Sequence, residues 1–122
     1  MEKVLALGGV FFRAKDPDAL TRWYADVLGI DFAGGFWLAD GGPTVLQPFR
    51  EDTQYFGDPS RSFMLNFRVA DLEKFVAQLR SAGIEVIQKP EWDSEFGRYA
   101  RLHDPEGNPV ELWEPGPAAP KS

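Results

Sequence analysis

Hydrophobic residues recur at the spacing of one helix face in two segments of the chain. The first segment lies between Asp16 and Gly29, and its apolar positions are Leu20, Trp23, Tyr24, Val27 and Leu28. The second lies between Asp71 and Gly83, and its apolar positions are Leu72, Phe75, Val76 and Leu79. An aspartate can accept the free N–H groups at the start of a helix, and a glycine readily ends one. We therefore predict two amphipathic helices of similar length.

Short runs rich in β-branched and aromatic residues flank both predicted helices. One run precedes each helix and three follow it, and the eight runs are residues 9–14, 31–33, 36–39, 44–49, 64–69, 85–88, 98–103 and 109–113. Glycine pairs and the sequence Asp104-Pro105-Glu106-Gly107 separate several of them, as turns do between strands. The pattern predicts the order β-α-β-β-β in each half of the chain.

The two halves also repeat one another. Residues 10–16 read VFFRAKD and residues 65–71 read LNFRVAD. Two similar units that cannot each bury an apolar face are expected to pack together, and the concave surface between them is a natural ligand site. We predict one domain over residues 1–122, with a first module at about 1–50, a connector at 51–62, a second module at about 63–115 and a flexible tail at 116–122.

Alternation along the strands separates a face that packs on the helices from an opposite face, which we call the cup face. In the last strand Val110 and Leu112 are expected to face the helices, which leaves Glu111 and Trp113 on the cup face. The same rule assigns further residues to the cup face, namely Gly9, Phe11, Arg13, Met64, Asn66 and Arg68.

The charge and composition of the chain limit the kinds of partner that it can bind. The chain has 13 Lys and Arg against 19 Asp and Glu, a formal charge of -6, which disfavours binding to a nucleic-acid backbone. It has no cysteine, which fits a reducing compartment, and its apolar start is too short to span a bilayer. We expect a cytoplasmic protein that binds neither nucleic acid nor membrane.

Two motifs carry a resemblance to a known family. The helix end Arg22-Trp-Tyr-Ala-Asp-Val-Leu-Gly29 and the closing Asp104-Pro-Glu-Gly-Asn-Pro-Val-Glu-Leu112, within two β-α-β-β-β modules, resemble the vicinal oxygen chelate superfamily over about residues 5–115. This superfamily contains glyoxalases, bleomycin-resistance-type binding proteins and extradiol dioxygenases. The resemblance implies an α+β fold, the glyoxalase/bleomycin resistance fold, in which two modules form a curled mixed sheet around a cup. It also implies a homodimer.

The resemblance further implies four positions for metal ligands. By position they are Gly9, Met64, Glu111 and Gln47, and a register slip of one residue would replace Gln47 by Leu46. Glycine and methionine cannot hold a hard divalent ion, which needs about three or more N or O ligands. We therefore expect no cofactor, with Glu111 as the retained ligand position and Gln47 as a marginal one. A divalent metal held by His103, Glu111 and an acid from elsewhere is the alternative.

Glu111 is the main candidate for chemistry. A carboxylate on the cup face of a central strand would be desolvated and would need a cationic partner, which Arg13, Arg68 or Arg101 could supply. Such a carboxylate can act as a general base, anchor a ligand, or form a structural ion pair. His103, just before the closing turn, is expected to be solvated, with an acid or base role at the rim as the alternative.

Polar and aromatic side chains complete the candidate ligand site. Paired guanidiniums at Arg13 and Arg68 can grip a carboxylate or phosphate, or satisfy nearby acids. The other candidates are amides and aromatic residues expected outside the helix core, namely Gln47, Asn66, Phe11, Trp37, Phe49, Tyr55 and Trp113. The connector is expected to act as a hinge or a lid, and the acid–aromatic stretch 91–99 is either a ligand-facing loop or a solvated hairpin.

These observations lead to a functional hypothesis. We expect a glyoxalase/bleomycin-resistance-type protein with a degraded metal site, which binds a small organic molecule in an aromatic cup for sequestration or metal-free chemistry. The alternative is a metal-dependent glyoxalase-like lyase or dioxygenase. A third option is a structural or partner-binding module.

Overall fold

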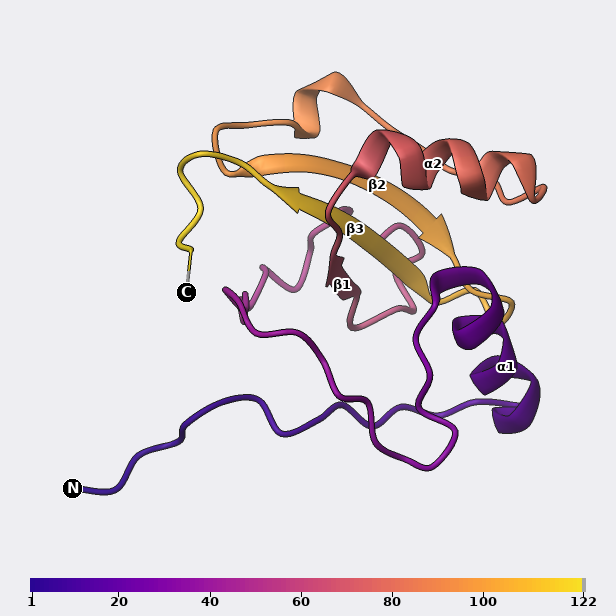
Figure 1. The fold of residues 1–122 in the computed structure, drawn as a ribbon, viewed down its shortest axis with the longest axis horizontal. Helices are drawn as coiled ribbons and strands as arrows, with labels where there is room; N and C mark the ends of the chain where they lie inside the picture. The colour runs from indigo at the N-terminus through magenta and orange to yellow at the C-terminus, as the bar shows by residue number, and fades with distance from the viewer. Residues whose placement is uncertain (122) are drawn as a thin grey trace.

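The computed structural model describes residues 1–121. In chain order its elements are the helix α1 (Pro17–Leu28), the strand β1 (Leu65–Arg68), the helix α2 (Leu72–Ser81), the short 3-10 helix η1 (Pro90–Trp92), and the strands β2 (Gly97–His103) and β3 (Pro109–Pro115) (Figure 1). None of the helices in this part of the chain is long and apolar enough to cross a membrane.

Both predicted helices are confirmed, and their ends follow from the residues that flank them. The Asp16 carboxylate accepts the Ala19 N–H at 3.1 Å, and Asp71 accepts the Lys74 N–H at 3.0 Å. Each bond satisfies a backbone donor that has no partner inside its helix. Gly29 ends α1 with φ at 73°, a left-handed conformation that glycine adopts without strain.

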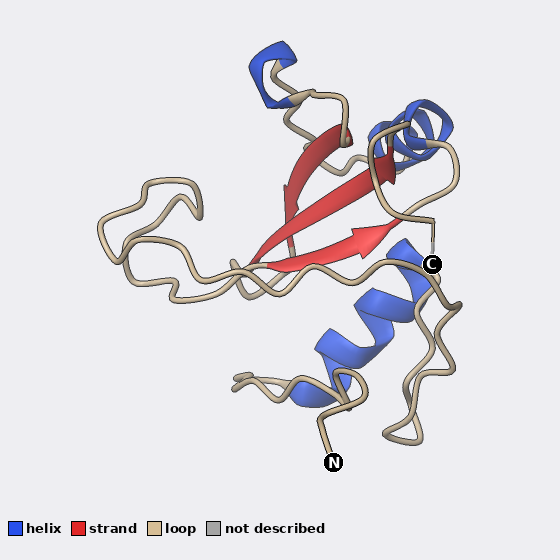
Figure 2. Cartoon of the chain, turned by 90° about the vertical axis from the view of Figure 1, so that its left-hand side faces the viewer, coloured by secondary structure: helices blue, strands red, loops and turns tan. Residues whose placement is uncertain are grey.

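The three strands form one mixed, open sheet in the order β1-β3-β2 (Figure 2). β3 lies in the centre, parallel to β1 and antiparallel to β2. Because both of its edges are paired, side chains on either face of β3 are easily shielded from water. This confirms the α+β class and the mixed sheet that the sequence predicts.

The hydrophobic core lies between one face of this sheet and the two helices. Its buried residues come from α1, α2, β2, β3 and the segments after the helices, and they are Leu20, Tyr24, Leu28, Ile30, Leu72, Val76, Leu79, Val86, Ala100, Leu102, Val110 and Leu112. Val110 and Leu112 face the helices as the alternation predicts, and they are 0% and 1% exposed. Glu111 and Trp113 therefore lie on the opposite face.

The strands predicted in the first half of the chain are not formed in the described residues. Residues 9–14, 31–33, 36–39 and 44–49 have no strand assignment, and 85–88 contribute only a bridge from Ile87 to Arg101. Within residues 1–121, the backbone of 1–14 makes no backbone hydrogen bond. Alternation chooses a face, but a strand also needs a neighbour for its N–H and C=O groups. Outside α1 and the residue Ile30 that follows it, the first half of the chain is therefore without strands and largely exposed.

The end of the chain differs from the expected flexible tail. The Gly116 N–H donates to the Phe96 carbonyl at 2.9 Å, and the Ala118 N–H donates to the Glu95 carbonyl at 3.0 Å. Ala119 is 7% exposed. These bonds hold residues 116–119 against the loop before β2, and Ser122 lies outside the described residues.

A buried hydrogen bond joins α1 to the turn between β2 and β3. The Tyr24 hydroxyl donates to the Asp104 carboxylate at 2.9 Å, and Tyr24 and Asp104 are 1% and 4% exposed. The same carboxylate accepts the backbone N–H groups of Glu106 and Asn108 at 2.9 and 3.0 Å, and the Asn108 side-chain amide at 2.7 Å. Asp104 thus organises the closing turn and connects it to the core.

We expect Tyr24→Phe to lower the free energy of unfolding by about 1 kcal/mol, because it removes one net hydrogen bond from the core. Urea denaturation measures this loss. In a double-mutant cycle, Asp104→Asn and the double variant are expected to show a coupling energy of about 0.5 kcal/mol or more. Strictly additive losses would show that the two side chains do not interact in solution.

Candidate functional site

A row of three polar residues crosses the cup face of the sheet. Asn66 of β1 pairs with Glu111 of β3, and Glu111 pairs with Arg101 of β2. The backbone N–H and C=O of Arg101 both bond to Ile87, each at 2.8 Å, and so point away from β3. Arg101 and Glu111 therefore form a pair without backbone hydrogen bonds between them, the kind whose side chains lie closest in an antiparallel sheet.

Glu111 is buried, at 6% exposed, and its carboxylate is held by two neutral donors. The Asn66 amide donates to Glu111 Oε1 at 2.7 Å, and the Tyr55 hydroxyl donates to Glu111 Oε2. A buried carboxylate is costly unless hydrogen bonds compensate for the lost water. These two bonds supply that compensation, and the one from Tyr55 attaches the connector to the sheet.

Arg101 is also buried, at 5% exposed, yet its guanidinium is poorly satisfied. Its Nε and Nη2 atoms have no hydrogen-bond partner within residues 1–121. The ion pairs within 4.0 Å in this part of the chain are Arg50–Asp52 and Lys74–Asp71, so Arg101 makes no direct ion pair with Glu111. Instead the guanidinium carbon lies 4.7 Å from the centre of the Tyr55 ring and 5.3 Å from the Trp92 ring.

Aromatic rings cover this polar row. The Tyr55 and Trp92 rings meet edge to face, with centres 5.9 Å apart, and Phe49 stacks on Tyr55 with centres 5.7 Å apart. The rings come from the connector, from η1 and from the segment before the connector. We call Glu111, Arg101, Asn66, Tyr55 and Trp92 the Glu111 cluster.

The electrostatics of the site act on two tyrosines. Burial raises the pKa of Tyr55 strongly, the hydrogen bond to Glu111 raises that pKa further, and the nearby Arg101 acts in the opposite direction. Burial also raises the pKa of Tyr99, and the negative charge of Glu111 raises that pKa by a smaller amount. Both phenols therefore stay protonated well above neutral pH, and Tyr55 keeps its hydrogen bond to Glu111 there.

Of the candidates predicted from sequence, the structure brings together Glu111, Asn66, Arg101, Tyr55 and Phe49. Trp113 lies on the same face two residues further along β3, 4% exposed, and donates from Nε1 to the Phe96 carbonyl at 3.0 Å. A Cβ on Gly97 would collide with the Trp113 ring, which explains the glycine there.

The other predicted residues lie away from the cluster. Arg68 is exposed and donates to the carbonyls of Gly41 and Asp40 at 3.2 and 3.1 Å, and Trp37 packs on Phe67 with ring centres 5.9 Å apart. Phe11 is 98% exposed, and Arg13, Gln47 and His103 are exposed as well. The symmetrical pair expected from Arg13 and Arg68 is not formed, because the first-half strand that would present Arg13 has no neighbour.

Trp92 is one of the aromatic residues expected outside the helix core, but it is absent from the ligand-site candidates selected from the sequence. It lies within the acid–aromatic stretch 91–99, whose role the sequence leaves open. It lies at the end of the one-turn helix η1, which begins at Pro90, and its ring lies 5.3 Å from the Arg101 guanidinium carbon.

The residues at the site do not fit a divalent ion. Gly9 and Met64 offer no hard donor, and Gln47 is exposed. Both Glu111 oxygens accept hydrogen bonds, and the residue paired with Glu111 on β2 is the cation Arg101. Residues 1–121 contain no group of three or more His, Cys, Asp or Glu side chains placed to hold a metal. A single carboxylate with these neighbours is a poor chelator.

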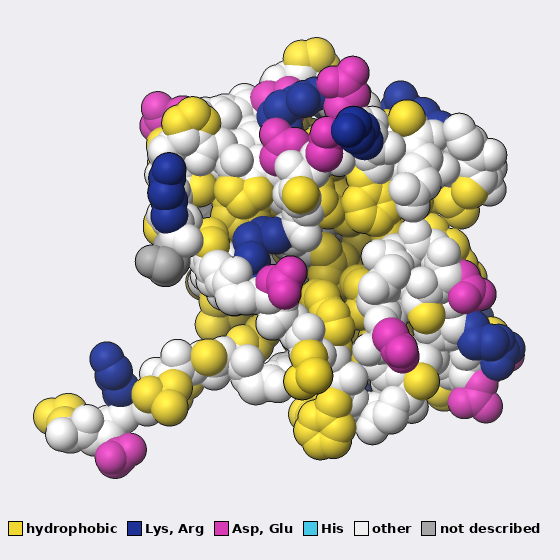
Figure 3. All heavy atoms as spheres, in the orientation of Figure 1, with side chains coloured by type: hydrophobic (Ala, Val, Ile, Leu, Met, Phe, Trp, Pro, Cys, Tyr) yellow, Lys and Arg dark blue, Asp and Glu magenta, His cyan; other side chains and the backbone are white. Residues whose placement is uncertain are grey.

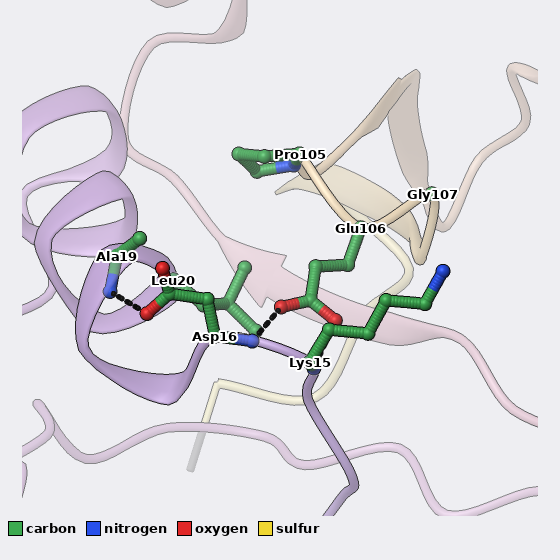
Figure 4. A pocket seen from close by; sticks show the side chains of 7 residues that line it. All are labelled: Lys15, Asp16, Ala19, Leu20, Pro105, Glu106 and Gly107. Atoms are coloured by element: carbon green, nitrogen blue, oxygen red, sulfur yellow. Dashed lines mark hydrogen bonds between the residues drawn. The ribbon is translucent and has the colours of Figure 1, made fainter.

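Two cavities lie elsewhere on the molecule. One, of about 370 Å³, lies between the start of α1 and the closing turn, where Glu106 accepts the backbone N–H groups of Lys15 at 2.6 Å and Asp16 at 2.9 Å (Figure 4). The other, of about 220 Å³, is apolar and includes Phe11 and Phe32. The two carboxylates that line the first cavity, Asp16 and Glu106, both accept backbone N–H groups at the start of α1, so neither cavity resembles the polar row at Glu111.

The model of the Glyoxalase-like domain family matches residues 9–113, so the chain belongs to this family. The matched region covers both modules, and the vicinal oxygen chelate superfamily indicated by the sequence motifs is confirmed.

Three individual proteins are similar to the chain. YraH of Bacillus subtilis (strain 168), named as an uncharacterized protein, is 26% identical over 110 residues, which are 77% of this chain and 86% of YraH. TnmS3, an antibiotic binding protein from Streptomyces sp. CB03234, is 26% identical with a TM-score of 0.57, over 93% of this chain and all of TnmS3 (100%). A glyoxalase/bleomycin resistance protein from the same Streptomyces is 24% identical with a TM-score of 0.50, over 82% of this chain and 92% of its own. These structures confirm the glyoxalase/bleomycin resistance fold.

We expect the stability of the protein to decrease as the pH rises above about 10. All three tyrosines, Tyr24, Tyr55 and Tyr99, have pKa values raised from the ordinary value of 10.0, mainly by burial. The folded state therefore holds these protons more tightly than the unfolded chain, and this contribution is full below the unfolded pKa and lost as the pH rises through the folded pKa values.

Urea denaturation at a series of alkaline pH values measures this effect, and tyrosinate absorbance is expected to rise together with unfolding. Tyr55→Phe should make the alkaline decrease less steep. Tyrosinate absorbance from all three residues in a still folded protein near pH 10 would contradict the assignment.

Proposed function

We propose that the protein binds a small organic molecule on the cup face, at the Glu111 cluster, without a metal ion. The observation that carries the proposal is the placement of a buried carboxylate and a buried guanidinium side by side under aromatic rings. Ligand sites combine apolar area with a few convergent polar groups in this way. The similarity to TnmS3, an antibiotic binding protein, supports the same class of function.

The connector gives this site a cover. Tyr55 is attached to the sheet by its bond to Glu111, and its neighbours Phe49 and Phe56 pack together with ring centres 5.2 Å apart. A ligand that reaches Glu111 and Arg101 must therefore displace the Tyr55 ring. The displacement costs little free energy, because the aromatic ring of a ligand can take the place of the Tyr55 ring and a polar atom of the ligand can take the place of the Tyr55 hydroxyl.

The donor set favours binding over metal-assisted chemistry. A Lewis acid needs several hard ligands, and Glu111 is the one ligand-type residue of the four expected positions that lies in the cluster. Both Glu111 oxygens are engaged, so use of this carboxylate as a base requires Tyr55 to move away first. We therefore propose sequestration as the main role, and the cytoplasm as its location because the cysteine-free composition suits a reducing compartment.

The proposed functional unit is a homodimer. Large apolar side chains of the first half are exposed, among them Leu5, Phe11, Phe36, Leu38 and Leu46 at 89%, 98%, 84%, 95% and 84%. Figure 3 shows hydrophobic side chains along the extended N-terminal segment and across the middle of this face. Exposed apolar area of this extent is typical of a surface that a partner covers. A second copy would also supply the strand neighbours that these segments lack.

We expect Trp92→Ala to weaken the binding of a planar aromatic antibiotic such as daunorubicin about tenfold or more, because the site loses a large aromatic ring. Fluorescence titration measures the Kd. The matched control is Trp37→Ala, since Trp37 contacts Phe67 away from the cluster. Equal losses in both variants, or binding that neither change affects, would place the ligand elsewhere.

Leu38→Glu is expected to convert the dimer to a monomer, because a charge on the proposed contact surface must be desolvated on association. Sedimentation velocity at several concentrations reports the oligomeric state. Phe96→Glu is the control, as Phe96 is 50% exposed but lies at the start of β2 outside the first half. A wild-type protein that is monomeric at every concentration would refute the dimer.

A further inference from the structure

The most unusual feature of the cup face is a buried cation with free donors. Arg101 is 5% exposed, and its Nε and Nη2 atoms are shielded from solvent and have no acceptor among residues 1–121. Leaving a buried donor without an acceptor costs about 1 to 3 kcal/mol, and more for a charged group. Buried donors of this kind are rare in folded proteins, and these two lack an acceptor among residues 1–121.

The two free atoms are on the same edge of the guanidinium. In arginine the Nε–H bond and one N–H bond of Nη2 point in parallel from the planar group, at the spacing of the two oxygens of a carboxylate. We call this edge the Arg101 fork. A single water or a carbonyl oxygen can satisfy one of these donors, whereas a carboxylate satisfies both at once.

No carboxylate of the described chain takes this place. The directly opposite acid, Glu111, accepts hydrogen bonds from Tyr55 and Asn66 and lies beyond 4.0 Å from the nitrogens of Arg101. Aromatic rings flank the guanidinium, with Tyr55 at 4.7 Å and Trp92 at 5.3 Å from its carbon. The surroundings of the fork therefore suit an acceptor group that is joined to a flat, apolar ring.

We infer that the Arg101 fork is the subsite for the carboxylate of an aromatic ligand. The inference rests on the proposed small-molecule binding and names the chemical class of the ligand. The carboxylate forms two parallel hydrogen bonds to Nε and Nη2, and its ring occupies the space that Tyr55 now fills beside Trp92. Entry requires the Tyr55 ring to move, so binding and displacement of the connector are coupled.

Titration of the full chain with benzoate, benzamide and phenyl phosphate tests this subsite, with tryptophan fluorescence as the readout. Benzoate and benzamide have nearly the same shape, but only benzoate offers two anionic oxygens. We expect benzoate to bind at least about tenfold more tightly than benzamide. Tighter binding of phenyl phosphate than of benzoate, or equal binding of benzoate and benzamide, would overturn the carboxylate assignment.

Two variants of Arg101 distinguish the effect of its paired donors from the effect of its positive charge. Arg101→Lys keeps the positive charge but lacks the fork, and Arg101→Met keeps the length of the side chain without any donor. Both are expected to lose the preference for benzoate over benzamide. Arg98→Lys is the matched control, because Arg98 is an exposed residue of the same strand β2, and it should keep the preference. An unchanged preference in Arg101→Met would refute the inference.

A thermal shift distinguishes loss of binding from loss of folding. Removal of unsatisfied buried donors should leave the melting temperature of Arg101→Met equal to or above that of the wild type. Benzoate is expected to raise the melting temperature of the wild type and of Arg98→Lys but not that of Arg101→Met. If daunorubicin binds in a Trp92-dependent way while benzoate shows no Arg101-dependent effect, the proposed function stands and the carboxylate subsite falls. If neither ligand binds in a way that depends on Trp92 or Arg101, the proposed function and the subsite both fall.

Discussion

The register of β3 is the constraint on which the rest of this structure depends. β3 is hydrogen bonded on both edges, so successive side chains along it point to opposite faces of the sheet. Val110 and Leu112 lie in the core, and Glu111 lies on the cup face. A shift by one residue would place a carboxylate against Leu72 and Tyr24 and would expose two core residues. The free-energy cost of such a register shift keeps Glu111 paired with Asn66 and Arg101. The polar row is thus a consequence of the hydrophobic pattern around it.

Burial of Glu111 explains the path of the connector. A desolvated carboxylate needs donors, and strand β1 supplies one through Asn66, which leaves the second oxygen to be satisfied from outside the sheet. Tyr55 is the group that reaches it, and in doing so it brings Phe49 and Phe56 over the cup face. One hydrogen bond therefore decides where the aromatic cover lies. In the proposed binding mode a ligand would displace this one phenol and would leave the strand pairing of the sheet intact.

The sequence predicts those parts of the molecule whose signals are local. Asp16 and Asp71 cap the helices, Gly29 ends the first of them, and the alternation after Asn108 places Glu111 on the cup face, all as expected. The predictions fail where the decisive partner is distant: residues 9–14 alternate well but have no neighbouring strand, and Arg68 finds the carbonyls of Gly41 and Asp40 instead of a symmetrical Arg13. The contact of Tyr55 with Glu111 spans 56 positions, and no periodicity reports it.

Two groups of side chains lack partners within the described residues: the exposed apolar side chains of the first half and the buried donors of Arg101. They differ in the kind of partner that they can bind. The exposed leucines and phenylalanines of the first half lose free energy to water in proportion to their area, so many apolar surfaces can cover them, including that of a second copy. The Arg101 fork is directional, because its two buried N–H groups donate in parallel, and a partner satisfies both best with two oxygens in the plane of the guanidinium. The exposed apolar side chains can therefore contribute to affinity but add little selectivity between partners. Selectivity between ligands of similar shape must therefore come from the fork, where a wrong group leaves a charged donor buried without an acceptor.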